Sequence, residues 1–126
     1  MKKVLITGCQ GQDGILLSNL FLKKNFAVYG FVKKKKKGIK NVNYKVNNLK
    51  SKKKIFNHFK NIKPDIIIHL ASSNSSYYKR KTTDSYKINY SQNLKITKNL
   101  IDAIIKTKFK LKFIFAGSSV MFAAKI

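Results

Sequence analysis

Residues 4–17 read VLITGCQGQDGILL: an apolar run, then glycines at positions 8, 11 and 14, then apolar residues again. Apolar residues without alternation are typical of a strand buried on both faces, so a parallel strand is predicted at Val4–Thr7. The next segment has the spacing of a helix over residues 11–24, with one buried face formed by Ile15, Leu16, Leu20 and Phe21. A strand, a glycine turn and a helix therefore open the chain.

The rest of the chain alternates between strand-like and helix-like segments. Further strands are expected at Phe26–Val32, Val42–Val46, Asp65–Ala71 and Phe113–Ala116. Helices are expected before Pro64 and again before the last strand. The buried face expected for the later, longer helix is formed by Tyr86, Tyr90, Leu94, Thr97, Ile101 and Ile104.

This order of segments predicts an α/β fold of the Rossmann type. Strands that alternate with helices form a doubly wound parallel sheet, with right-handed crossovers and helices on both faces. About five strands are expected before the sequence ends. The chain has no internal repeat or linker, so residues 1–126 are expected to form one domain.

The strongest feature of the composition is a formal net charge of +24, from 28 basic and four acidic residues. Such a charge favours polyanionic partners. However, the lysines are spread along the whole chain, and Arg80 is the only arginine. Proteins that read nucleic acids use arginine for bidentate contacts, so nucleic-acid binding is not the expected function.

Cysteine usage and hydropathy bear on the cellular compartment. Cys9 is the only cysteine, which excludes an internal disulfide framework and suits a reducing cytoplasm. The longest apolar runs, such as Ile66–Ile68, are far too short to span a membrane, and no signal peptide precedes the glycine turn. A cytoplasmic protein without a membrane partner is expected.

The three glycines are typical of a turn that receives the pyrophosphate of a dinucleotide. Gly8 permits the tight turn, Gly11 lets the backbone approach the phosphates, and Gly14 allows the helix to pack closely on the sheet. The helix N-terminus adds free N–H donors and the positive end of the helix dipole, which stabilises Asp13 and lets it cap neighbouring amides. The alternative is a glycine turn without a ligand.

The end of the second strand bears on the choice of cofactor. Sites that bind NAD carry an acidic residue there, which binds the ribose hydroxyls. This chain instead reads YGFVKKKKK and has no acidic residue between Phe26 and Lys63. Lys33 or Lys34 could pair with a 2′-phosphate, so NADP is expected rather than NAD. The alternative is a solvated lysine loop.

Four segments, in order along the chain, resemble the extended short-chain dehydrogenase/reductase family, which includes NAD-dependent epimerases and dehydratases. The first is the glycine turn, whose GQDG ending most resembles the GDP-mannose 4,6-dehydratases of that family. The others are PDIIIHLASS at Pro64–Ser73, NLKITKNLIDAI at Asn93–Ile104 and FIFAGSSVMFA at Phe113–Ala123.

The resemblance implies roles for named residues. The residues expected to bind the cofactor phosphates are Gly8, Cys9, Gln10, Gly11, Gln12, Asp13 and Gly14. Asn48 and Leu49 stand where the family usually has Asp-Leu beside the adenine. The residues expected along the rest of the cofactor are Leu70, Ala71 and Ser72. Ser118 matches the family's catalytic Ser or Thr, which would hydrogen-bond the C4 oxygen of the sugar.

The reaction implied by the resemblance is a 4,6-dehydration of a nucleotide-sugar, with GDP-mannose as the expected substrate. Hydride moves from C4 to bound NADP, water is lost across C5–C6, and hydride returns to C6. A homo-oligomer is expected for a full-length relative.

The chain also departs from the family's pattern. Dehydratases carry a glutamate two residues after the catalytic Ser or Thr, whereas this chain has Val120 there and no glutamate at all. Ile96 replaces a glycine. The family's catalytic Tyr-x-x-x-Lys follows the fifth strand at a distance, and no such pair is found in that place before Ile126. The substrate-binding part is therefore expected to be absent.

These departures leave three alternatives open. The chain could come from an epimerase or reductase of the same family, which Val120 favours. It could be a cofactor-binding module without chemistry, or a basic nucleic-acid-binding protein.

Of the two histidines, His69 is expected to be packed rather than catalytic, because no acid or thiol is near it in sequence, and His58 is expected at the surface.

Overall fold

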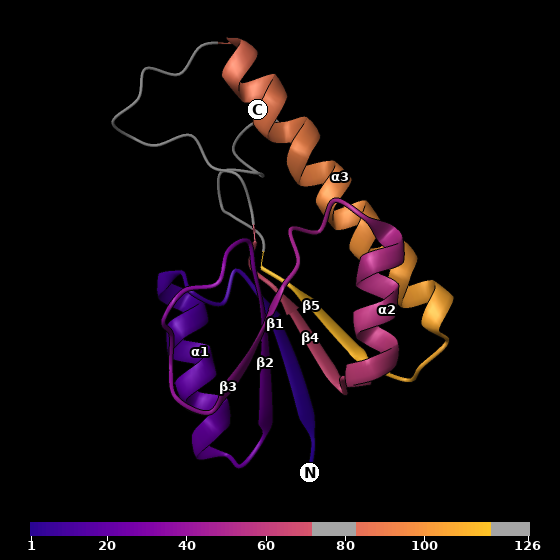
Figure 1. Cartoon of the computed structure of the whole chain (residues 1–126). Helices are drawn as coiled ribbons and strands as arrows, with labels where there is room; N and C mark the ends of the chain where they lie inside the picture. The colour runs from indigo at the N-terminus through magenta and orange to yellow at the C-terminus, as the bar shows by residue number, and fades with distance from the viewer. Residues whose placement is uncertain (72–82, 117–126) are drawn as a thin grey trace.

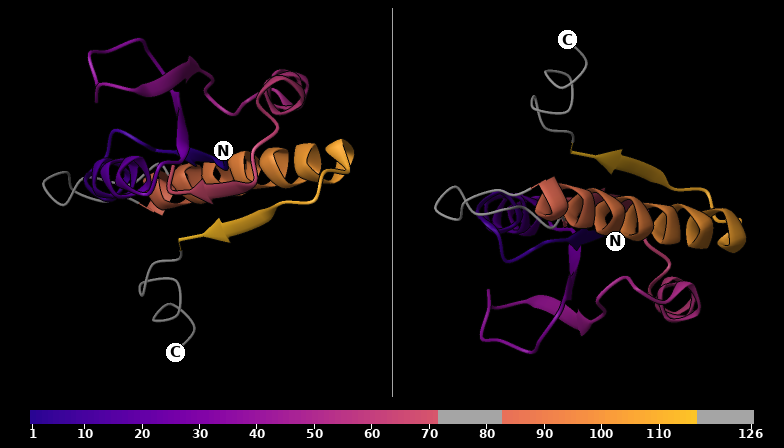
Figure 2. Two further views of the ribbon diagram at one scale, coloured as in Figure 1. Left: turned by 90° about the horizontal axis from the view of Figure 1, so that it is seen from below. Right: turned by 90° about the horizontal axis from the view of Figure 1, so that it is seen from above.

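A computed structural model describes the backbone of residues 1–71 and 83–116, and the side chains of residues 1–71 and 91–116. Five parallel strands form one sheet in the order β3-β2-β1-β4-β5. The strands are β1 (Lys3–Thr7), β2 (Ala27–Val32), β3 (Val42–Val46), β4 (Ile66–His69) and β5 (Lys112–Phe115). β3 and β5 lie at opposite edges (Figure 2). The predicted Rossmann-type parallel sheet is confirmed.

Helices cover both faces of this sheet. Helix α1 (Gln12–Lys23) lies on one face, and helices α2 (Lys52–Ile62) and α3 (Thr83–Thr107) pack together on the other (Figure 1). Strand order reverses at β1, whose neighbours are β2 on one side and β4 on the other. In sheets of this kind, ligands bind outside the carboxyl ends of the strands at such a switch point.

Each face of the sheet has its own apolar core, because alternate residues of a strand point to opposite faces. On the α2 and α3 face, Leu5 and Ile67 of the central strands contact Ile55, Phe59 and Leu100. On the α1 face, Val4, Ile6, Val28 and Ile68 form the core. The two central strands are thus buried on both sides, as their apolar runs predict.

The buried face expected for α1 is wrong for three of its four residues, whereas the fourth, Phe21, is partly buried and packs against the core. The side chains of Ile15, Leu16 and Leu20 are 42%, 64% and 46% exposed, whereas Gly14 and Ser18 are buried. The Ser18 hydroxyl donates a hydrogen bond of 2.7 Å to the Gly14 carbonyl oxygen, so it carries no unsatisfied polar group into the interface. The small residues let the helix approach the sheet more closely than an isoleucine or leucine stripe would.

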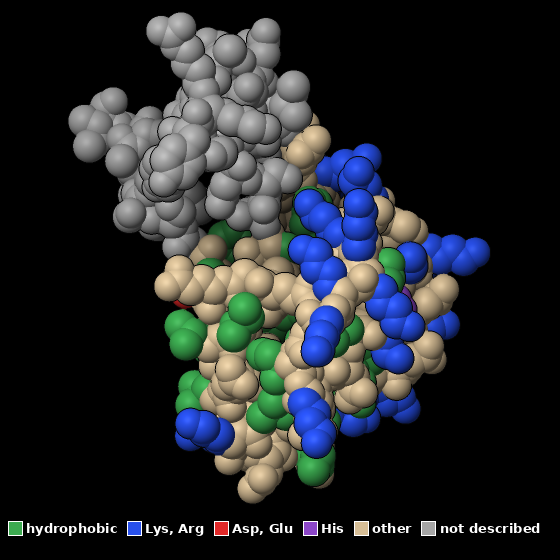
Figure 3. Space-filling model, turned by 60° about the vertical axis from the view of Figure 1, so that its left-hand side comes forward, with side chains coloured by type: hydrophobic (Ala, Val, Ile, Leu, Met, Phe, Trp, Pro, Cys, Tyr) green, Lys and Arg blue, Asp and Glu red, His purple; other side chains and the backbone are tan. Residues whose placement is uncertain are grey.

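The face expected for α3 is also displaced. Leu94 and Ile101 are 58% and 38% exposed, and the buried stripe runs through Ile96, Leu100 and Ala103. The expected Thr97 and Ile104 are partly buried at its border. The side chains of Tyr86 and Tyr90 lie outside the described residues. Figure 3, which brings the α1 side of the molecule forward, shows hydrophobic side chains at the surface beside many lysines.

Helix α2 shows the expected amphipathic pattern, with Ile55, Phe59 and Ile62 buried. Ser51 caps its N-terminus by accepting a hydrogen bond of 3.3 Å from the backbone N–H of Lys54. Within the described part of the chain, no helix is both long enough and apolar enough to cross a bilayer.

Candidate functional site

A cavity of about 530 Å³ lies at the carboxyl ends of β1, β2, β3 and β4. Its walls come from the segments that follow these four strands, although those segments are far apart in sequence. The predicted site residues that line it are Gly8, Cys9, Gln10, Gly11, Lys33, Lys34, Asn48, Leu49, Leu70 and Ala71. The topology thus brings ten of the expected residues together at one place.

The turn after β1 needs glycine at its first position. Gly8 has a left-handed backbone with φ at 65°, and a Cβ added there would lie only 2.8 Å from the backbone nitrogen of Ala71. Gly14 is equally constrained, because a Cβ would run into the backbone of Gly8 and Cys9. The first turn of α1 therefore lies directly against the glycine turn, which requires a residue without a side chain at position 14.

Helix α1 begins at the cavity with Gly11 as its N-cap residue. Among the described residues no side chain caps this end of the helix, so Asp13 does not cap neighbouring amides as expected. Asp13 is an exposed residue of the first turn, where the helix dipole favours a carboxylate. The first amides of a helix lack intrahelical partners, which suits this end to binding an anion.

The cavity wall after β2 combines apolar and basic residues. Phe31 and Val32 are buried, and the exposed Lys33, Lys34 and Lys36 follow them around the same cavity. Lys33 and Lys34 were expected here from the sequence, whereas Lys36 was not. The residues that line the cavity include these lysines but no carboxylate, so an anionic group bound here would be attracted to the wall and not repelled by it.

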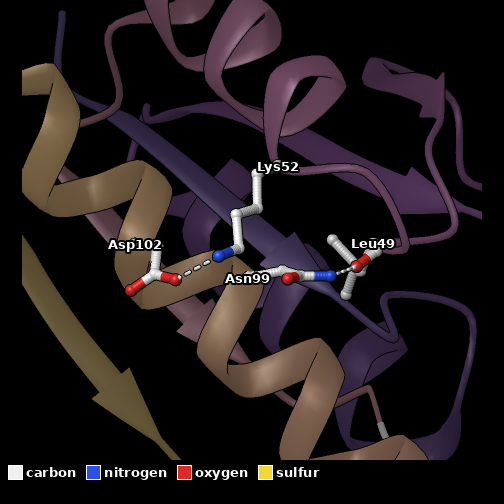
Figure 4. A network of polar contacts seen from close by, with 4 residues as sticks. All are labelled: Leu49, Lys52, Asn99 and Asp102. Atoms are coloured by element: carbon white, nitrogen blue, oxygen red, sulfur yellow. Dashed lines mark hydrogen bonds and ion pairs between the residues drawn. The ribbon is translucent and has the colours of Figure 1, made fainter.

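The segment after β3 holds Leu49 in an unusual conformation. Leu49 is 3% exposed and has φ at 65°, a left-handed region that leucine rarely adopts. Its backbone N–H donates to the Asn47 side-chain oxygen at 2.9 Å, and its carbonyl accepts from the Asn99 side-chain amide at 3.0 Å (Figure 4). Two buried asparagines therefore fix this part of the cavity wall.

The location expected for His58 is wrong, because it is half-buried rather than at the surface. Its Nδ1 lies 2.9 Å from the Asn47 side-chain nitrogen, and its ring lies 5.3 Å from the Phe31 ring. Burial, followed by the charges of Lys54 and Lys45, lowers the pKa of His58. A neutral imidazole can accept the hydrogen bond from Asn47.

His69 lies at the end of β4, as expected for a packed histidine, and is 2% exposed. Its Nδ1 is 2.6 Å from the Thr7 hydroxyl, and its Nε2 is 3.1 Å from the Thr97 hydroxyl. The Thr7 hydroxyl is also 3.0 Å from the backbone nitrogen of Leu70 and 3.1 Å from that of Ala71. Burial lowers the pKa of His69 to about 4.

Cys9 is buried behind the glycine turn, and its thiol contacts the Phe31 carbonyl oxygen at 3.6 Å. Burial raises the pKa of the Cys9 thiol to about 11. A thiol with so high a pKa is a poor nucleophile and metal ligand at neutral pH. The described residues contain no group of three or more histidine, cysteine or acidic side chains suited to a metal ion.

Three of the expected site residues that the structure describes do not line the cavity. Gln12 and Asp13 are exposed on the first turn of α1, and Gly14 is buried against the turn. Ser72 and Ser118 lie outside the described residues, as does Val120. The lining residues that sequence reasoning did not assign to the cofactor are Thr7, Phe31, Val32, Lys36, Asn47 and Ile96.

Some of these residues carried a signal in the sequence. Thr7 is a polar residue at the end of an apolar strand, and Asn47 precedes the Asn-Leu pair. Ile96, which stands where the family has glycine, is 9% exposed and forms part of the wall. No sequence feature indicated a role for Asn99 or Thr97, because only the packing of α3 brings them to the site.

A glycine turn at a switch point, a helix N-terminus and a basic wall define the class of dinucleotide-binding Rossmann domains. The sequence model of the NAD dependent epimerase/dehydratase family matches residues 4–126, so the chain belongs to that family. No curated protein matched the chain.

Solved structures share the fold at low sequence identity. UDP-glucose 4-epimerase from Brucella ovis, solved with NAD, has a TM-score of 0.82 and 18% identity over 94% of this chain and 36% of its own. The UDP-Glc/GlcNAc 4-epimerase from Campylobacter jejuni has a TM-score of 0.76 and 23% identity over 97% of this chain and 39% of its own.

A short chain dehydrogenase from Leptospira borgpetersenii, solved with NAD⁺, has a TM-score of 0.74 and 23% identity over 99% of this chain and 54% of its own. The chain thus spans between about a third and just over half the length of these structures.

Proposed function

We propose that this chain is the NADP-binding part of a nucleotide-sugar 4,6-dehydratase whose substrate is GDP-mannose. The observation that carries the proposal is the cavity that gathers Gly8–Gly11, the lysines after β2 and Leu70–Ala71 at one edge of the sheet. In this proposal residues 1–126 form one incomplete domain, and the substrate-binding part lies elsewhere in a full-length protein.

The turn residues fit a bound diphosphate. A Cβ added at Gly11 would make an ordinary van der Waals contact of 3.5 Å with the Gly8 carbonyl oxygen, and among the described residues no atom beyond its neighbours in the chain lies closer to it. Amides at the start of α1 would donate to the phosphate oxygens, and Gln12, Asp13 and Gly14 would contribute through the helix end rather than through side-chain contacts.

The lysines in the wall after β2 support the proposal of NADP rather than NAD. The 2′-phosphate of NADP is a dianion near neutral pH. Lys33, Lys34 and Lys36 line the cavity after β2, where NAD-binding sites carry an acidic residue that would repel this phosphate. Asn48 and the buried Leu49 would lie beside the adenine, and Leu70 and Ala71 farther along the cofactor. Two of the similar structures were solved with NAD, which makes NAD the competing ligand in any test.

In the full-length protein, a bound nicotinamide cofactor would supply the hydride transfer that the proposed reaction needs. Ser118 is proposed to hydrogen-bond the C4 oxygen. Because the catalytic Tyr and Lys of the family have no counterpart in the expected place, this chain alone is proposed to bind NADP weakly and to turn over nothing.

A second candidate is an epimerase or reductase of the same family. Val120 stands where dehydratases carry the glutamate that takes the C5 proton, and the sequence contains no glutamate. An epimerase needs no such base. For either enzyme, a cytoplasmic location and a homo-oligomeric full-length protein remain our expectations.

Fluorescence titration of the chain with NADPH and with NADH tests the proposal. We expect NADPH to bind at least about tenfold more tightly, and the double variant Lys33→Gln/Lys34→Gln to remove that preference. Lys110→Gln is the matched control, because Lys110 is exposed and precedes β5 at the opposite edge of the sheet. Equal affinity of the wild-type chain for the two dinucleotides would contradict the proposed preference for NADP.

Affinity for neither dinucleotide would contradict the proposed function itself. A steep loss of DNA affinity with salt, unaffected by nucleotide, would instead support the nucleic-acid-binding alternative.

A further inference from the structure

The hydrogen bonds around Thr7 determine which atoms carry hydrogen. Its hydroxyl is within bonding distance of the backbone N–H groups of Leu70 and Ala71, at 3.0 and 3.1 Å. The Leu70 N–H is shared with the Thr7 carbonyl oxygen at 3.2 Å. A hydroxyl has two lone pairs and one hydrogen, so a hydroxyl that accepts twice must donate its hydrogen to a third partner.

That third partner is Nδ1 of His69, only 2.6 Å away. Because Nδ1 accepts, a neutral His69 must carry its hydrogen on Nε2, and Nε2 then donates to the Thr97 hydroxyl at 3.1 Å. The chain of bonds therefore has one direction: Thr97 of α3 accepts from His69, which accepts from Thr7. Thr7 and His69 are 0% and 2% exposed, so water does not compete for these bonds.

The backbone held by Thr7 forms one wall of the cavity. Leu70 and Ala71 line it beside the glycine turn, and Gly8 approaches Ala71 so closely that a Cβ would lie 2.8 Å from its nitrogen. A small displacement of Ala71 would either close the space above Gly8 or open the wall. The position of this segment therefore sets the shape of the site.

We propose that His69 is a positioning residue for the dinucleotide: as the Nε2–H tautomer it fixes the Thr7 hydroxyl, which holds Leu70 and Ala71 in place, and it ties this wall to helix α3. This inference rests on the proposed function for its ligand but not for its hydrogen bonds. His69 does not touch the cavity and takes no part in chemistry.

Isosteric variants separate this role from simple packing. Thr7→Val keeps the shape but removes the acceptor, and we expect it to weaken NADPH binding by about tenfold. Thr7→Ser restores the hydroxyl and should bind within about threefold of wild type. His69→Leu should behave like Thr7→Val, whereas His69→Asn keeps an acceptor near Nδ1 and should bind more tightly than His69→Leu.

Thr107→Val is the matched control. Thr107 is also a buried threonine, and its hydroxyl donates to the Ile104 carbonyl oxygen at 2.7 Å near the other end of α3. It should leave NADPH affinity unchanged. A folded Thr7→Val or His69→Leu chain that binds NADPH as wild type does would overturn the inference.

Two measurements on the chain without ligand keep the inference testable if a variant fails to fold or if no dinucleotide binds. Nitrogen NMR of the His69 ring should show the Nε2–H tautomer, and an Nδ1–H tautomer would overturn the inference. The Leu70 and Ala71 amides should exchange slowly with solvent hydrogen in the wild-type chain, and fast exchange would also overturn it. If both results are as expected but NADPH does not bind, the proposed function fails and the positioning network remains.

Discussion

The side-chain amide of Asn99 on α3 donates a hydrogen bond of 3.0 Å to the carbonyl oxygen of Leu49, which holds a left-handed backbone at φ 65°. One turn farther along α3, Asp102 forms an ion pair of 2.8 Å with Lys52 of α2 (Figure 4). Both contacts join α3 to the same region of the chain. They differ in burial, because Asn99 is 4% exposed while the two charged side chains are 55% and 36% exposed.

We therefore predict that Asn99→Leu lowers the free energy of unfolding by about 1–3 kcal/mol, because the Leu49 carbonyl loses its buried donor and its strained backbone loses a support. Urea denaturation measures this change. Lys52→Gln is the matched control and should have a much smaller effect, since exposed ion pairs contribute little. Equal losses for the two variants would contradict the role given to Asn99.

Two glycines of the turn should respond differently to alanine. At Gly14 a Cβ would run into rigid backbone, so Gly14→Ala should destabilise the chain by about 3 kcal/mol or more. At Gly11 the added methyl group has room, so Gly11→Ala should change stability by no more than about 1 kcal/mol while weakening NADPH binding at least about tenfold. Thermal unfolding and NADPH titration of both variants test this contrast. A Gly11→Ala chain with wild-type affinity would show that no ligand approaches the backbone there.

The lowered pKa of His69 predicts a loss of stability in acid. An unfolded histidine binds a proton below about pH 6.5, whereas folded His69 does so only below about pH 4. Between these values the unfolded state holds more protons, so the free energy of unfolding should fall as the pH drops through this window, by about 3 kcal/mol in total. Above about pH 6.5, His69 contributes no pH dependence to the free energy of unfolding.

Urea denaturation at a series of pH values measures this effect. His58, whose pKa is also lowered, contributes in the same direction, so the comparison is made with His69→Asn. That variant should show a shallower dependence between pH 6.5 and 4. Identical profiles for the two chains would assign the acid sensitivity to other groups.

The thiol of Cys9 should be unreactive in the folded chain, because it is buried and its pKa is raised to about 11. We predict that alkylation by iodoacetamide at pH 8 is at least about a hundredfold slower than for the chain in urea, since the thiolate is the reactive form. Mass spectrometry follows the reaction. Comparable rates in the two conditions would mean that the segment behind the glycine turn opens readily.

The order of elements was predictable because apolar runs and glycine positions are local signals. The helix faces were not, because α1 and α3 carry apolar residues on more than one side. In α1 the small residues Gly14 and Ser18 are buried and Phe21 packs against the core, whereas Ile15 and Leu16 are exposed. The period of an apolar pattern identifies a helix, but in a helix with apolar residues on more than one side it does not determine which side faces the sheet.

The candidate site likewise contains some residues that were predictable from the sequence and others that were not. Gly8, Lys33 and Leu70 were predictable because each directly follows a strand, and parallel strands end at the same edge. Asn99 and Thr97 were not, since their partners are 50 and 28 residues away and are reached only through the packing of α3. Hydrogen bonds of that kind depend on tertiary structure alone.

The most direct test of the account is an NMR titration of the isotope-labelled chain with NADPH, following each backbone amide. The account predicts that the largest shifts fall on residues 8–14, with further shifts at Lys33, Lys34 and Ala71. Shifts of the glycine-turn amides no larger than those of the Lys110 control region, or a response confined to the lysines, would contradict the claim that this turn binds the diphosphate.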